Sequence, residues 1–126
     1  MSSAYPYVHI YTDTAGETHI ERKVFTLERN DFSPPTAFFD LSAPEAIDSL
    51  SVLRLPPGWA GDEWHPSPYR HWQIYLAGEI LFEVSDGSSC TVSAGQIILL
   101  GDTTGKGHKA RAMHGKEVFL TSMKAR

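Results

Sequence analysis

Short segments in which apolar and polar residues alternate dominate this chain. The runs are rich in β-branched and aromatic residues and are separated by Gly, Pro, Asn and Asp, the pattern of β-strands joined by turns. Asp86-Gly87 predicts a tight hairpin, because Gly accepts a positive φ without steric cost. The pattern predicts strands at Tyr7–Tyr11, His19–Thr26, Ser49–Leu55, His71–Ala77, Glu79–Ser85, Ser89–Ser93, Gln96–Leu100, His108–Met113 and Glu117–Ser122.

Helical periodicity is nearly absent. Pro44–Leu50 predicts a single turn, with Ser42 as a possible N-cap, and the prolines of Phe32–Thr36 predict an extended connector. Many short strands predict an all-β sandwich or barrel. We expect one domain over residues 1–126, with N-terminal strands and a connector over about 1–48 and the barrel over about 49–124. The N-terminal part is too small to bury a core alone.

Alternation within His71–Ala77 predicts a ligand cavity. One face carries His71, Gln73 and Tyr75, and the other carries only apolar side chains, among them Trp72 and Leu76. We expect the apolar face to be buried. The polar and aromatic face is typical of the wall of a binding site, where Gln73 and Tyr75 would orient a ligand.

Composition and charge limit the partners. The 126 residues are 41% hydrophobic and 21% charged, with a formal net charge of −4, which gives no reason to expect a nucleic acid or an anionic membrane as partner. We expect no signal peptide and no membrane span. The single cysteine, Cys90, excludes an intrachain disulfide and is expected to be a buried thiol. These features predict a cytoplasmic protein whose partner is a small molecule.

Three histidines, His65, His71 and His108, lie at the edges of predicted strands. Imidazoles that converge across a small barrel are candidate metal ligands. The alternative is that they form hydrogen bonds in a pocket that holds no metal. The other histidines lack matching partners and are expected at the surface, at an interface or in a turn: His9, His19 and His114.

Three further residues near these histidines are candidates for the site. Asp102 opens the loop Asp102–Gly107, where an Asx-type turn is the favoured interpretation and a general base is the alternative. Trp64 precedes His65 and is expected to line the mouth of the pocket. Arg70 is expected either to neutralise a carboxylate on the ligand or to be a solvated residue at a strand edge.

The spacing around the first histidines resembles the first motif of the cupin superfamily of small β-barrels. That motif has a Gly, a His-x-His pair, a Glu three or four residues later, and a Gly after six more. Here Gly58 and His65 match, Ser67 stands at the second His, His71 stands near the Glu, and Gly78 closes the motif.

The second cupin motif has a Gly, five residues, Pro-x-Gly, two residues and a His. Gly95 begins it here, Gly101 and Thr103 replace the Pro and Gly, and His108 comes two residues late. The resemblance covers roughly residues 50 to 124. It implies a double-stranded β-helix, or jelly-roll-like barrel, with extra N-terminal strands.

The resemblance also implies a metal site at His65, His71 and His108 for Fe, Mn, Ni or Zn, although Ser67 is a poor ligand for such ions. The implied activity is that of a metal-dependent oxygenase, isomerase or lyase acting on an oxygenated or aromatic compound. One alternative is a metal-free binding or sensory module. Another is a metal-free isomerase or epimerase with His65 or His108 in an acid–base pair.

A homodimer is expected on other grounds. The outer face of the barrel is apolar, and the spare N-terminal strands would otherwise leave an exposed sheet edge.

Overall fold

The computed structural model describes residues 2–30 and 37–126, so the expected connector Phe32–Thr36 lies outside it. Within these ranges no helix is long and apolar enough to cross a membrane. The described residues form strands β1 (Ser2–Thr12), β2 (Thr18–Asn30), β3 (Phe39–Ser42), β4 (Ile47–Leu55), β5 (Ala60–His65), β6 (His71–Ala77), β7 (Glu79–Val84), β8 (Ser89–Ser93), β9 (Ile97–Leu100), β10 (His108–Ala112) and β11 (Val118–Ala125).

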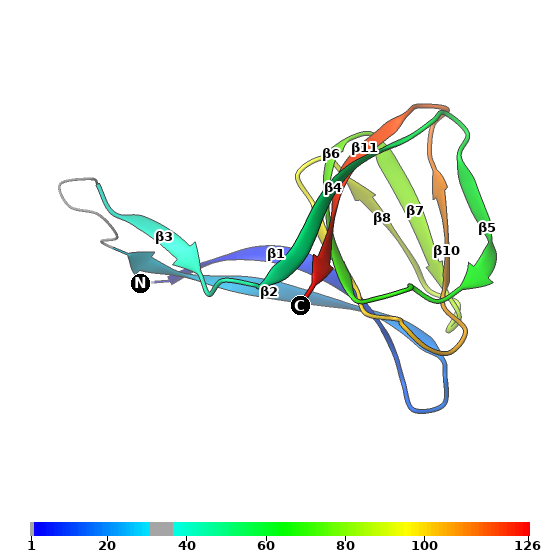
Figure 1. Ribbon diagram of the computed structural model, residues 1–126, viewed down its shortest axis with the longest axis horizontal. Helices are drawn as coiled ribbons and strands as arrows, with labels where there is room; N and C mark the ends of the chain where they lie inside the picture. Colours follow the sequence, from blue (N-terminus) through cyan, green and yellow to red (C-terminus); the bar gives the residue numbers. More distant parts are fainter. Residues whose placement is uncertain (1, 31–36) are drawn as a thin grey trace.

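The strands form two sheets that enclose a barrel (Figure 1). One sheet has the order β3-β2-β1-β9-β6-β11-β4, and the other has the order β5-β10-β7-β8. Strands β4, β11, β6 and β9 therefore form one wall of an eight-stranded jelly roll, and β5, β10, β7 and β8 form the other. The all-β, double-stranded β-helix predicted from the sequence is confirmed.

The core lies between the two walls. It includes Tyr75 of β6, Phe82 of β7 and Ile98 of β9, and β1 covers one end with Val8 and Ile10. Cys90 also belongs to this core, as predicted, and burial raises the pKa of its thiol.

The outward face of β6 is covered only in part. Trp72 is 4% exposed because the rings of Tyr7 and Phe25 lie against it, with centroids 5.3 and 5.4 Å away. Leu76, further along the same face, is 53% exposed. The prediction that this whole face is buried is therefore wrong for Leu76 within one copy of the chain.

The sequence pattern missed two strands and wrongly predicted one helical turn. β3 and β5 were not predicted, because β3 alternates over only four residues and β5 does not alternate clearly between apolar and polar residues. The turn predicted at Pro44–Leu50 is absent, and β4 begins at Ile47, which is paired with Ala125 of β11. β4 is paired with β11 along its whole length, and this pairing, not local propensity, determines its conformation.

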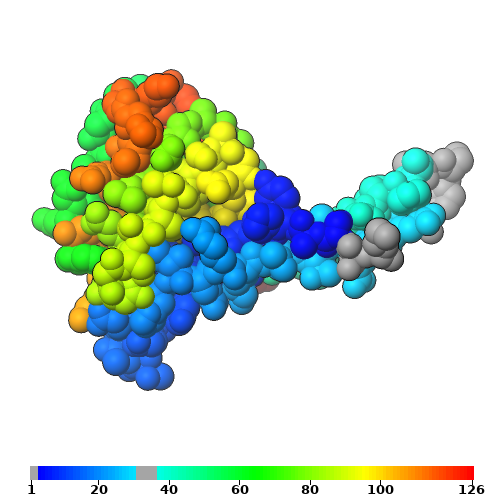
Figure 2. Space-filling view, turned by 180° about the vertical axis from the view of Figure 1, so that it is seen from behind, coloured from blue at the N-terminus to red at the C-terminus, as the bar shows by residue number. Residues whose placement is uncertain are grey.

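The hairpin of β1 and β2 extends beyond the barrel. Its ladder runs from Ser2↔Glu28 to Thr12↔Thr18, but only Val8–Ile10 of β1 pairs with β9. The open end of the hairpin, together with β3, projects as an arm from one side of the barrel (Figures 1 and 2). We call residues 3–7, 23–28 and 39–42 the arm.

His19 ties the closed end of this hairpin to the barrel. Its Nε2 lies 2.7 Å from Asp13 Oδ2 and its Nδ1 lies 2.9 Å from Asp86 Oδ2. An imidazole donates to two carboxylates only when it is protonated. The hydrogen bond with Asp13, followed by that with Asp86, raises the pKa of His19, and the pKa values of both carboxyls are lowered.

We predict that this cluster stabilises the fold in a pH window. The contribution of His19 is complete below its unfolded pKa of about 6.5 and is lost as the pH rises through its raised folded pKa. The stability contributed by the carboxylates of Asp13 and Asp86 is lost as the pH falls below about 4. Thermal unfolding should show a lower Tm for His19→Gln than for wild type at pH 6 and no difference at pH 9. His114→Gln, a change at an exposed histidine, is the control, and an equal deficit at both pH values would contradict the assignment.

Candidate functional site

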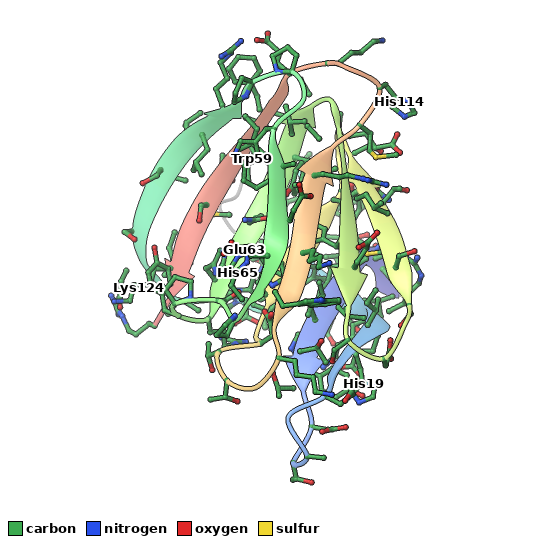
Figure 3. The ribbon with its side chains drawn as sticks, turned by 90° about the vertical axis from the view of Figure 1, so that its right-hand side faces the viewer. His19, Trp59, Glu63, His65, His114 and Lys124 are labelled. Atoms are coloured by element: carbon green, nitrogen blue, oxygen red, sulfur yellow. The ribbon has the colours of Figure 1, made fainter. Side chains whose placement is uncertain are left out.

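A cavity of about 220 Å³ opens between the two walls of the barrel. Its polar residues come from both walls, with His65 and His108 on one side and His71, Gln73 and Tyr75 on the other. Figure 3 shows Trp59 and His65 at the two ends of β5. The remaining lining is mostly apolar: Leu53, Leu55, Trp59, Ser67, Pro68, Ile80, Phe82, Leu100, Ala110 and Leu120.

His65 and His108 are brought together by strand pairing. They are register partners on antiparallel β5 and β10, and their ring centroids are 4.7 Å apart. His65 is exposed at the mouth, whereas His108 is 6% exposed. His65 Nδ1 donates to the carbonyl of Glu63 at 2.9 Å, so its Nε2 is the nitrogen left for a ligand.

Asp102 orients His108. Its side chain is fully buried, with 0% exposure. One carboxylate oxygen lies 2.6 Å from His108 Nδ1, which donates its proton, and the other accepts from the Ser67 hydroxyl at 2.9 Å. The favoured interpretation of Asp102 as an Asx-turn residue is therefore wrong, because its carboxylate serves Ser67 and His108. His108 lines the cavity, and its Nε2 remains available for a ligand because Asp102 uses its Nδ1.

Gly107 allows the loop that carries Asp102 to lie against His65. Its φ is +75°, and a Cβ at this position would fall 2.0 Å from the carbonyl oxygen of His65. A glycine is required here both for the dihedral and for the close approach. The Gly107 carbonyl also accepts from the Thr18 hydroxyl at 2.7 Å, which joins the loop to β2.

His71 belongs to a separate network on the opposite wall. Its Nδ1 donates to the Tyr69 carbonyl at 2.9 Å, and its Nε2 accepts from the Gln73 amide at 3.3 Å. The Tyr75 hydroxyl donates to Gln73 Oε1 at 2.8 Å, so each donor meets an acceptor along the chain of bonds. Burial is the main cause that lowers the pKa of His71, which favours the neutral imidazole that this network needs. Burial also raises the pKa of Tyr75.

The three predicted metal ligands thus differ in whether their Nε2 is available to bind a metal. His65 and His108 present a free Nε2, whereas Gln73 uses the Nε2 of His71. Among the described residues, no group of three or more His, Cys, Asp or Glu side chains is arranged to hold a metal ion. The arrangement therefore does not complete a three-imidazole site, and such a site stays a prediction.

Two other predicted contact residues do not line this cavity. Trp64 is 46% exposed, and the Lys109 ammonium lies 4.8 Å from the centroid of its ring. The guanidinium of Arg70 lies 5.9 Å from the ring centroid of Trp72, on the outward face of β6. The described lining holds no Lys, Arg, Asp or Glu, so a ligand would meet imidazoles, an amide and two hydroxyl groups but no carboxylate, ammonium or guanidinium group.

Sequence reasoning missed the joint role of Asp102 and Ser67. The two residues are 35 positions apart, and each is of a type that is ordinary in loops. Their contact forms only when the segment before β6 meets the loop before β10. No local pattern in the sequence shows this.

The strand order and the cavity define the class of protein: an all-β jelly-roll barrel with a histidine-lined internal pocket. No family model matches the chain, and no curated protein matches it. Among solved structures, it is similar to the Cnp3 cupin domain of Schizosaccharomyces pombe, with 12% identity, a TM-score of 0.48, and coverage of 99% of this chain and 84% of that one. It is also similar to protein NMB1881 of Neisseria meningitidis, with 15% identity, a TM-score of 0.44, and coverage of 66% of this chain and 84% of that one.

Proposed function

We propose that the chain binds a small organic molecule in the barrel and that His108 acts on it as a general base. The observation that supports this is the buried pair of Asp102 and His108, whose oxygen and nitrogen lie 2.6 Å apart. The carboxylate keeps the proton on Nδ1 and leaves a lone pair on Nε2. When Nε2 takes a proton from the ligand, the same carboxylate stabilises the imidazolium that forms.

The size and lining of the cavity indicate the class of ligand. At about 220 Å³, it is smaller than the roughly 300–1,000 Å³ of pockets for drug-sized molecules. Aromatic and aliphatic side chains suit an apolar part of the ligand, and the imidazoles and Gln73 suit one or two oxygen atoms. A small carbonyl compound with a C–H bond next to the carbonyl fits this description.

Proton abstraction predicts exchange with solvent. When the protein is incubated in D₂O with a panel of small carbonyl compounds, NMR should show deuterium entering at least one of them next to the carbonyl. His108→Gln should lower that rate by about 10²–10⁴-fold, because it removes the base. Asp102→Asn should also lower it, since its oxygen would accept from Ser67 and its NH₂ would donate to Nδ1, which places the imidazole proton on Nε2 and removes the lone pair of the base. His114→Gln should leave the rate unchanged.

Two results would contradict the proposal. Exchange that persists in His108→Gln would show that another group is the base. A compound that raises the Tm of wild type but never exchanges would instead support a binding or sensory module without catalysis.

A divalent metal site is a second candidate function. The favouring observation is that His65 and His108 both donate Nδ1–H to protein oxygens, the arrangement that orients histidine ligands in metal proteins. Imidazole ligands suit Fe, Ni or Zn better than Mn, which prefers oxygen ligands. His71 would join them only if Gln73 released its Nε2.

Metal content tests this second candidate. In untagged protein purified after growth in each metal, elemental analysis should find close to one equivalent, and His65→Ala and His108→Ala should lose it. Gln73→Ala should bind Zn²⁺ more tightly than wild type, because it frees the Nε2 of His71. His114→Ala should match wild type. Content far below one equivalent in every metal, together with no uptake of added Zn²⁺, would remove the metal hypothesis.

A further inference from the structure

The hydroxyl protons of the cavity are already used by other groups of the protein. Ser67 and Tyr75 are the hydroxyl-bearing residues of the described lining. The Ser67 hydroxyl donates to the carboxylate of Asp102 at 2.9 Å, and the Tyr75 hydroxyl donates to Gln73 Oε1 at 2.8 Å. A hydroxyl has a single proton, so each of these oxygens can only accept a hydrogen bond from a ligand.

The imidazoles add to this excess of acceptors. His65 and His108 each donate the proton on Nδ1 to a protein oxygen, which leaves Nε2 of the neutral ring as an acceptor. His71 offers a ligand neither a proton nor a lone pair, because Tyr69 and Gln73 use its two nitrogens. At the end of the cavity where the histidines lie, a ligand therefore meets lone pairs on both walls.

Donors are scarce in the same lining. The Gln73 amide has two hydrogens, of which one is donated to His71 Nε2 at 3.3 Å, so the other remains for a ligand. The indole N–H of Trp59 is a further donor, but Trp59 lies at the opposite end of β5 from His65 (Figure 3). Among the described residues, the polar end of the cavity therefore presents several acceptors and only the Gln73 amide as a free side-chain donor.

We propose that the ligand is an uncharged hydroxy-carbonyl compound whose hydroxyl groups donate to His65 and Tyr75. Its carbonyl accepts the remaining proton of Gln73, and His108 is left for the neighbouring C–H bond. The carbonyl and the C–H bond rest on the proposed function, whereas the hydroxyl donors follow from the lining itself. A ligand that displaces water from these acceptors without donating to them leaves their lone pairs unpaired, which weakens binding.

The same lining disfavours charged relatives of this ligand. A carboxylate brings lone pairs but no proton, so it would face other acceptors with no ammonium or guanidinium group to neutralise it. An ammonium group brings protons but would lose water without gaining a carboxylate, since Asp102 is fully buried and does not line the cavity. An uncharged hydroxyl is therefore the donor that these acceptors fit best.

Ketones of equal size that differ in their hydroxyl groups test the proposal. In 3-pentanone, 1-hydroxy-2-butanone and dihydroxyacetone, hydroxyl groups replace none, one and both of the terminal methyl groups. NMR titration of ¹⁵N-labelled protein gives each dissociation constant, which should fall about 2–10-fold with each hydroxyl, the effect of one hydrogen bond. Pyruvate and 3-aminopentane, which have the same size but carry a negative and a positive charge, should bind more weakly than dihydroxyacetone.

Substitutions in the lining test which groups the hydroxyls contact. His65→Leu removes an acceptor at an exposed position, so the fold should be kept, which circular dichroism checks. It should reduce the preference for dihydroxyacetone over 3-pentanone about 2–10-fold. Gln73→Leu removes the donor to the carbonyl, so it should weaken the binding of both ketones and keep that preference. His114→Gln, a change at an exposed histidine outside the cavity, is the control and should match wild type.

The outcomes separate this inference from the proposed general base. Binding of 3-pentanone, pyruvate or 3-aminopentane as tightly as dihydroxyacetone would overturn the hydroxyl-bearing ligand, and so would the absence of binding by every compound. Deuterium that enters 3-pentanone as fast as dihydroxyacetone would also overturn it, while His108 would remain the base. Selective binding of dihydroxyacetone without deuterium exchange would support the ligand class and refute the base.

Discussion

A fully buried carboxylate, that of Asp102, organises the polar end of this barrel. Burial of an unpaired charge is costly, so Asp102 is stable there only with its hydrogen bonds to Ser67 and His108. The backbone carbonyl of Asp102 also accepts from the Ser67 amide at 2.8 Å. The loop before β10 and the segment before β6 are thereby held together. The orientation of His108, and with it the chemistry proposed for the cavity, follows from this one group.

The strict alternation of side chains along β6 gives its two faces different environments. On β6, the same backbone presents His71, Gln73 and Tyr75 to the cavity and Trp72 and Leu76 to the outside. The inner face is satisfied by hydrogen bonds within one chain. The outer face is apolar and only partly covered within one chain, since Trp72 is buried and Leu76 is exposed. A ligand in the cavity would therefore meet only the inner side of this sheet, and substitutions at outward positions such as Leu76 leave the polar lining of the cavity intact.

The sequence predicts the parts of this structure that depend on local pattern. Period-two alternation finds most strands and assigns His71, Gln73 and Tyr75 to one wall, and motif spacing places His65 and His108 near each other. It does not find β3 or β5, which are short segments that become strands through pairing with β2 and β10. It also misreads Asp102, because an aspartate in a Gly-rich loop ordinarily caps a turn. Ser67, which donates a hydrogen bond to the Asp102 carboxylate, is distant from it in sequence.

The most direct test of the account is the protonation state of each ring nitrogen of His108. Long-range ¹H–¹⁵N correlation spectra of protein labelled at histidine, recorded where the imidazole is neutral, distinguish the two tautomers. The account predicts a proton on Nδ1, held by Asp102, and a bare Nε2. It also predicts that Asp102→Ala weakens this preference. A proton on Nε2 in wild type would contradict it, because that nitrogen then has no lone pair with which to take a proton or bind a metal.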